Sequence, residues 1–165
     1  MALVTLFGDK TIRRALEAQA AVKPDRTYLT FEGAALSVAE LDSRVNRLAN
    51  GLLALGLERG DRVAVMLLNH PDHVTTFLAC AKLGLVQVPV NVHLRGASLE
   101  YLLEHVEPRL VIADAAFIEF LAPALLKTKR TAVVWRDGMP EVQGLAVQSF
   151  EIVMALGDDE PDRKS

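Results

Sequence analysis

The stretch that most constrains the fold of this 165-residue chain runs from Leu36 to Pro89. It opens with Ser37 and Glu40 at the spacing of a capping box, in which each side chain accepts a hydrogen bond from the other residue's backbone N–H. Apolar residues then recur at steps of three and four, which places them on one face of a helix: Val38, Leu41, Val45, Leu48, Leu52 and Leu55. This pattern predicts an amphipathic helix that ends near Gly56.

An unbroken apolar run from Val63 to Leu68 follows a polar turn. It predicts a strand that is covered on both faces, as in a parallel sheet between layers of helices. Pro71 is suited to the first position of a helix, and Gly84 is suited to its end. We expect this helix to bury the stripe Val74, Phe77, Leu78 and Ala81. Extended structure resumes at residues 86–90, so the stretch predicts a βαβ unit.

The remaining residues repeat the alternation of strands and helices. The expected elements are a helix at 10–22, a hairpin at 27–31 and 34–36, a helix at 99–106, a strand at 110–113, a helix capped by Asp114 and broken or kinked at Pro123, a strand at 131–135 and a short helix at 149–156. This order predicts an α/β fold with a doubly wound, mostly parallel sheet flanked by helices. Residues 1–156 are expected to form this unit, and 157–165 a polar tail or the start of a linker.

Composition excludes several classes of function. Eighteen basic and 21 acidic residues give a formal charge of −3, and no basic stripe is interleaved with aromatic residues, so nucleic acid is not an expected partner. No apolar run reaches the roughly 18 residues that a membrane span needs. A single cysteine, together with an N-terminus unlike a signal peptide, favours the reducing cytoplasm.

The sequence also lacks the common motifs of an active site. The turn at residues 68–72 has no glycines with which to approach a pyrophosphate, and neither a GxxxxGK[ST] phosphate loop nor a GxSxG elbow is present. His70 and His73 lie near the spacing of metal ligands, but no further ligand completes a shell, so we predict no metal site. Cys80 lies between alanines and is interpreted as a core residue rather than a nucleophile.

Five phrases, taken together, resemble the N-terminal part of the adenylate-forming superfamily of AMP-dependent synthetases and ligases. They are LSVAEL (36–41), NRLA (46–49), GLERGDRVA (56–64), LNHPD (68–72) and KLGLVQVPVN (82–91). The similarity covers about residues 10 to 155, and NVHLRGASLEYLL (91–103) is most similar to acyl-CoA and carnitine-CoA ligases. The resemblance implies a reaction in which a carboxylate is joined to AMP from ATP, pyrophosphate is released, and the acyl group passes to coenzyme A.

The resemblance implies ATP, magnesium and coenzyme A for the intact enzyme, but no catalytic residue can be assigned here. The family's phosphate loop, magnesium-binding glutamate and catalytic lysine match no position of this sequence. By resemblance, Asn69, His70 and Phe77 border the acyl pocket, and the loop with His93 and Arg95 faces the phosphates of coenzyme A. The alternatives are that residues 69–71 form only a helix start and that the His93/Arg95 loop is only solvated.

Two hypotheses of function follow. The first is an N-terminal fragment of an AMP-forming acyl-CoA synthetase that is inactive alone, with the rest of the ligase chain as its partner and exposed apolar surface that drives self-association. The alternative is a standalone, non-catalytic binding or interaction module on the same scaffold. A receiver-type signalling domain is disfavoured, because it needs an acidic cluster at the strand ends and only Asp114 lies at such a place.

Overall fold

A five-stranded parallel sheet forms the centre of the molecule in the computed structural model, which describes residues 11–128 and 132–159. The strand order is β4-β3-β5-β6-β7, and each neighbouring pair is parallel. The strands are β3 (Arg62–Met66), β4 (Val86–Pro89), β5 (Leu110–Asp114), β6 (Ala132–Arg136) and β7 (Val147–Ser149). In chain order this is the 2-1-3-4-5 arrangement of doubly wound sheets, which confirms the predicted fold class.

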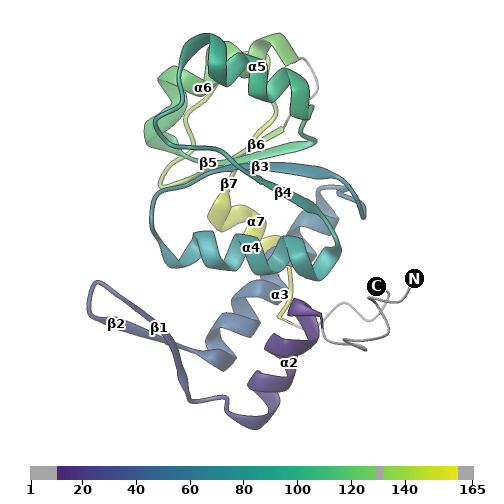
Figure 1. The fold of residues 1–165 in the computed structure, drawn as a ribbon, viewed down its shortest axis with the longest axis vertical. Helices are drawn as coiled ribbons and strands as arrows, with labels where there is room; N and C mark the ends of the chain where they lie inside the picture. The colour runs from purple at the N-terminus through teal and green to yellow at the C-terminus, as the bar shows by residue number, and fades with distance from the viewer. Residues whose placement is uncertain (1–10, 129–131, 160–165) are drawn as a thin grey trace.

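Helices cover both faces of the sheet (Figure 1). On one face lie α3 (Val38–Ala54), α4 (Pro71–Leu83) and α7 (Phe150–Leu156); on the other lie α5 (Gly96–Val106) and α6 (Ile118–Thr128), which the 3₁₀ turn η1 (Ala115–Phe117) precedes. Two separate apolar clusters result, one on each side of the strands. Every residue of β5 is buried, so this double cover explains its apolar run at residues 110–113.

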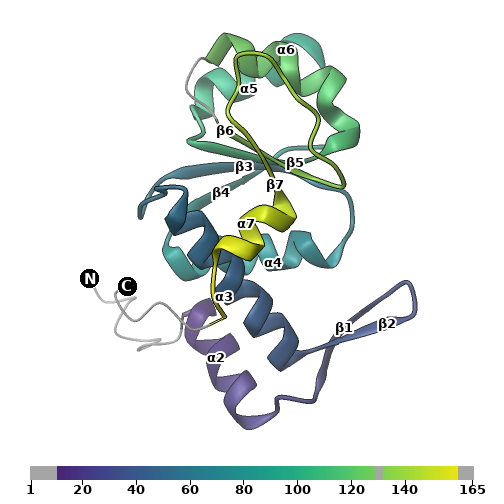
Figure 2. The ribbon, with the colours of Figure 1, turned by 180° about the vertical axis from the view of Figure 1, so that it is seen from behind.

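The first described elements stand apart from the sheet. They are α2 (Ile12–Val22) and the antiparallel hairpin of β1 (Thr27–Phe31) and β2 (Ala34–Ser37). Figure 2 shows the hairpin projecting beside α4. Its turn residues Glu32 and Gly33 both have positive φ, at 50° and 83°, as a two-residue hairpin turn requires. The predicted hairpin is therefore confirmed.

The long helix α3 has the predicted boundaries and buried face. Ser37 and Glu40 form the full capping box, and all the predicted core positions except Leu55 are buried. Gly51 is needed on this helix because a Cβ there would lie 2.0 Å from the carbonyl oxygen of Val153 on α7. The close approach of α7 to α3 therefore depends on this glycine.

The predicted cap at Asp114 was wrong. The side chain of Asp114 makes no capping hydrogen bond, because its carboxylate is engaged by Leu68 and Arg136 instead. Of the two alternatives at Pro123, the break was also wrong, since α6 continues through it to Thr128, and the kink stays a prediction.

The start of the predicted polar tail is held against α3. Asn46 donates to the carbonyl of Asp159 at 2.9 Å, and Asn50 donates to the carbonyl of Asp158 at 3.0 Å. Residues 160–165, together with Lys10 and Thr131 of other predicted elements, lie outside the described residues, and the boundary at residue 156 stays a prediction. Across residues 11–128 and 132–159, no helix is both long and apolar enough to cross a membrane.

Candidate functional site: an apolar groove beside α4

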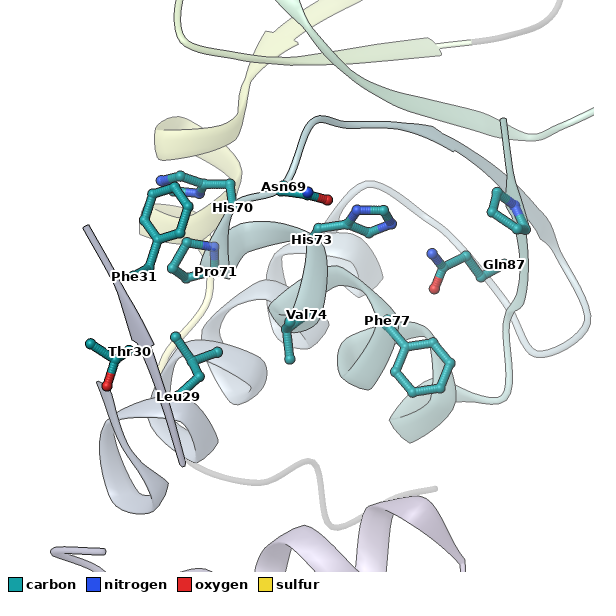
Figure 3. Close-up of a pocket in the computed structure, with 11 residues that line it drawn as sticks. Leu29, Thr30, Phe31, Asn69, His70, Pro71, His73, Val74, Phe77 and Gln87 are labelled. Atoms are coloured by element: carbon teal, nitrogen blue, oxygen red, sulfur yellow. The ribbon is translucent and has the colours of Figure 1, made fainter. Parts of the chain in front are cut away.

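An open groove lies between the β1–β2 hairpin, the first half of α4 and the edge strand β4 (Figure 3). Its volume is about 590 Å³. The lining residues are Leu29, Thr30, Phe31, Asn69, His70, Pro71, His73, Val74, Phe77, Gln87 and Pro89. Apolar side chains predominate, with His73 and Gln87 among the polar groups. This composition, an apolar lining with a few polar groups, is typical of small-molecule sites.

The groove exists because Phe77 of α4 is left outside the core. The predicted stripe is confirmed at Leu78, which is buried, but it was wrong at Phe77, which is 45% exposed; Val74 is only partly buried, whereas Thr75 and Thr76 are fully buried. Each threonine hydroxyl donates to a carbonyl of the preceding turn, at 3.1 Å and 2.7 Å. Because the helix itself satisfies these hydroxyls, the threonines can face the core, and Phe77 is left to line the groove.

His70 is held firmly at the start of α4. Its Nδ1 accepts the backbone N–H of Asp72 at 3.1 Å, so the ring caps the helix. The ring also meets Phe31 of the hairpin edge to face, with centroids 5.2 Å apart. Arg44 of α3 holds the Asp72 carboxylate at 2.5 Å. This chain of contacts joins the hairpin, α4 and α3 at one end of the groove.

The structure brings three of the five predicted site residues together. Asn69, His70 and Phe77 all line the groove, and their predicted role at an acyl pocket stays a prediction. Sequence reasoning missed the contribution of the hairpin and of Gln87. The one available signal was the alternation in residues 27–31, which predicts a strand with two different faces.

His93 and Arg95 lie elsewhere, on the loop between β4 and α5. The guanidinium of Arg95 donates to the carbonyls of Val92 and Leu94 at 2.6 Å and 2.8 Å, and it stacks over the Phe120 ring at 3.7 Å. Arg95 therefore holds its own loop against α6, whereas the side chain of His93 is exposed. Their predicted contact with coenzyme A stays a prediction.

The position at which doubly wound sheets bind ligands holds a buried ion pair in this protein. That position is the carboxyl edge between β3 and β5, where the chain leaves one strand toward α4 and the other toward α6 on the opposite face. Asp114 accepts the backbone N–H of Leu68 at 2.8 Å and pairs with Arg136 at 2.5 Å. Both charged side chains are almost fully buried. A carboxylate thus occupies the place where a phosphate would otherwise meet backbone amides.

The single cysteine, Cys80, lies in the buried core. Burial raises the pKa of the Cys80 thiol to about 12, so it is protonated at neutral pH. Within the ranges 11–128 and 132–159, no set of three or more His, Cys, Asp or Glu side chains could hold a metal ion. The groove itself offers a mainly apolar binding surface with His70, His73 and Gln87 among its polar groups.

The chain matches a known protein family and several of its members. The family model for AMP-binding enzymes matches residues 16–161. The chain is 34% identical over 145 residues to long-chain fatty acid transport protein 6 of Mus musculus, covering 84% of this chain and 22% of that protein. It is 32% identical over 117 residues to a crotonobetaine/carnitine–CoA ligase of Salmonella typhimurium, covering 68% and 23%.

Solved structures show the same fold. The anthranilate CoA ligase AuaEII matches with a TM-score of 0.81 at 22% identity, over 92% of this chain and 29% of that one. A long-chain-fatty-acid CoA ligase of Rhodopseudomonas palustris, described as putative, matches with a TM-score of 0.79 at 27% identity, over 94% and 38%. The chain thus spans about a fifth of the length of the curated relatives that it matches.

Proposed function

The chain belongs to the family of AMP-binding enzymes, and from this premise we propose that its 165 residues are the N-terminal part of an AMP-forming acyl-CoA ligase. The intact enzyme would act in the cytoplasm on a carboxylic acid, ATP and coenzyme A. Support comes from relatives that are named as CoA ligases or as a fatty acid transport protein. The proposed contribution of this part is a rigid scaffold and one wall of the acyl-binding site.

The observation that carries this proposal is the apolar groove. Asn69, His70 and Phe77, which the family resemblance places at the border of an acyl pocket, lie together in a space of about 590 Å³. Leu29 and Val74 extend the apolar surface toward the hairpin. Burial of methylene groups against such a surface is worth about 0.8 kcal/mol each, so the groove suits the apolar portion of an acid.

The described residues do not fit a triphosphate. The N–H of Leu68, at the start of the β3–α4 loop, is bound to Asp114, and a second negative charge beside that carboxylate would be repelled. We therefore derive no chemical step from this chain. In the proposed ligase, ATP and magnesium are held by residues outside the described ranges.

Binding of a model acid tests the groove. We expect octanoate to shift the backbone amide NMR signals of α4 near Val74 and Phe77, and the Phe77→Asp variant to weaken this binding at least about tenfold, because a charge would enter an apolar lining. Ile152→Asp is the matched control, since Ile152 of α7 is 44% exposed but does not line the groove. Equal losses in both variants, or shifts elsewhere, would refute the acyl role and favour a non-catalytic module.

The loop with His93 and Arg95 is proposed to face the phosphates of coenzyme A in the intact ligase. Arg95→Ala should raise the KM for coenzyme A there, whereas Phe120→Leu removes only the ring beneath the guanidinium and keeps the charge. If Phe120→Leu has the same effect as Arg95→Ala, the arginine only positions its loop. An unchanged KM for coenzyme A in both variants would contradict the proposed contact.

We also propose that the 165 residues alone are inactive and self-associate through exposed apolar surface. No ATP–pyrophosphate exchange is expected above a blank, and sedimentation velocity should show species larger than a monomer at high concentration. An exchange rate that survives repurification, or a clean monomer, would contradict the respective statement.

A further inference from the structure

Helix α3 carries a polar network that contacts two segments distant in the sequence. On one side, Lys82 of α4 forms an ion pair with Glu17 of α2 at 3.1 Å, and it also donates to the Oδ1 of Asn46. The Lys82 side chain is only 3% exposed. A buried ammonium needs such partners, because an unpaired charge in the interior is costly.

On the other side, the same Asn46 binds the segment after α7. Its Nδ2 donates to the carbonyl of Asp159 at 2.9 Å, while Asn50, one turn further along α3, donates to the carbonyl of Asp158. Gly157 makes this possible, because a Cβ there would lie 2.0 Å from the carbonyl oxygen of Arg47. Figure 2 shows the chain leaving α7 and passing along α3 toward α2.

The amide of Asn46 therefore belongs to both contacts at once. Its oxygen faces the ammonium of Lys82 and its nitrogen faces the backbone of residue 159, so rotating the amide to suit one partner would place the wrong atom against the other. Asp42 adds to this constraint, since its Oδ2 lies 3.4 Å from the Asn46 nitrogen. Hydrogen bonds that share a member reinforce one another in a dry environment.

We propose that Asn46 couples the docking of α2 to the docking of residues 157–159, so that the two segments bind α3 cooperatively. When both are seated, the network fixes the direction in which the chain leaves the sheet. When α2 is released, Lys82 loses Glu17 and withdraws from its site, and the hold of Asn46 on residue 159 weakens. This is a conformational device of the scaffold and does not depend on the identity of the acid.

Hydrogen exchange measured by mass spectrometry on the full 165-residue chain tests the coupling. Glu17→Gln removes the charge on α2 without touching α3, and Gly157→Ala displaces residues 157–159 without touching α2. We expect Glu17→Gln to increase the exchange rate at 157–159, and Gly157→Ala to increase the exchange rate across α2, each by about threefold or more. An effect of this size lies at the low end of the coupling measured between residues of one network. Asn50→Ala is the milder substitute if Gly157→Ala does not fold.

Two controls distinguish coupling between α2 and residues 157–159 from a general loss of stability. Glu100→Gln breaks the exposed ion pair with Lys127 on the opposite face of the sheet and should leave exchange at α2 and 157–159 unchanged. Asn46→Ala should abolish the mutual effect, so that adding Glu17→Gln to it no longer alters residues 157–159. If each variant changes only its own segment, or if the effects persist without Asn46, the proposal is wrong.

Discussion

The carboxyl edge of the sheet at β3 and β5 and the groove beside α4 are reached from the same loop, residues 67–70, yet they are built in opposite ways. At the edge, Asp114 and Arg136 are buried together and fill the space. In the groove, Phe77 and its neighbours leave an open apolar surface. A buried ion pair thus lies at the fold's usual ligand position, whereas the groove at the side of the sheet has an open apolar surface.

Disturbing the ion pair at the sheet edge should cost more stability than disturbing the groove. Asp114→Ala leaves the Arg136 guanidinium buried without its main partner, and loss of one member of a buried pair costs about 3 to 5 kcal/mol. The free energy of unfolding from urea titration measures this. Asp137→Asn is the control, because Asp137 contacts the same arginine but is 69% exposed, and asparagine keeps the positive φ of 58° at low cost; it should cost less than about 1 kcal/mol. Similar small losses in both would mean that the edge is not held by this pair.

The apolar core behind the groove is the next most sensitive region. Leu48 is fully buried on α3, and Leu48→Ala should cost about 2 to 5 kcal/mol through lost burial and a residual cavity. Urea denaturation of the variant checks this. A change below about 0.5 kcal/mol would show that the buried face of α3 is misassigned.

Truncating a side chain that lines the groove should cost little stability. Phe77→Ala should lower the free energy of unfolding by only about 1 kcal/mol, because 45% of Phe77 is already exposed, whereas Phe117→Ala should cost about 3 kcal/mol or more. Phe117 is the matched residue, since it is 8% exposed. If both substitutions lower the free energy of unfolding equally, Phe77 is packed as tightly as Phe117 and the groove is not open.

The smallest expected effect is a pH dependence at α2. Burial acts to raise the pKa of Glu17, but its hydrogen bonds with Lys82 and Arg13 outweigh burial and leave the pKa lowered. A carboxylate with a lowered folded-state pKa stabilises the fold above its unfolded pKa, and this contribution is lost as the pH falls through the folded value.

Wild type should therefore be more stable than Glu17→Gln near pH 5, by less than about 1 kcal/mol because Glu17 is partly exposed. This difference should shrink as the pH falls to about 3. Asp42 has the opposite dependence, because burial raises its pKa despite the nearby ammonium of Lys82, but it is present in both proteins and its contribution largely cancels in the difference. A difference that stays constant with pH would show that the Glu17 charge does not contribute.

Most of the fold could be predicted from the sequence because its signals are local. The capping box at Ser37, the turn at Glu32 and Gly33, and the unbroken apolar strands each follow from neighbouring residues. The groove could not be predicted in the same way. It depends on Thr75 and Thr76 satisfying their hydroxyls within α4, so that these threonines are buried while Phe77 is not. It also depends on a hairpin that lies some forty residues earlier in the chain.

The role of Asp114 was mispredicted for a similar reason. From sequence, an aspartate before a helix is a capping residue, and the competing partners Leu68 and Arg136 become visible only when three strands lie side by side. In contrast, Asn69 and His70 were assigned to the site from a phrase that resembles the family, and the fold does bring them to one groove.

The most direct test of the account is one NMR titration of the 165-residue chain with octanoate and, separately, with ATP and magnesium. The account predicts that octanoate shifts the amide signals of Val74, Phe77 and Gln87, while ATP leaves the signals of Leu68 and Asp114 unchanged. Saturable shifts at Leu68 and Asp114 with ATP, and none in the groove with octanoate, would contradict it.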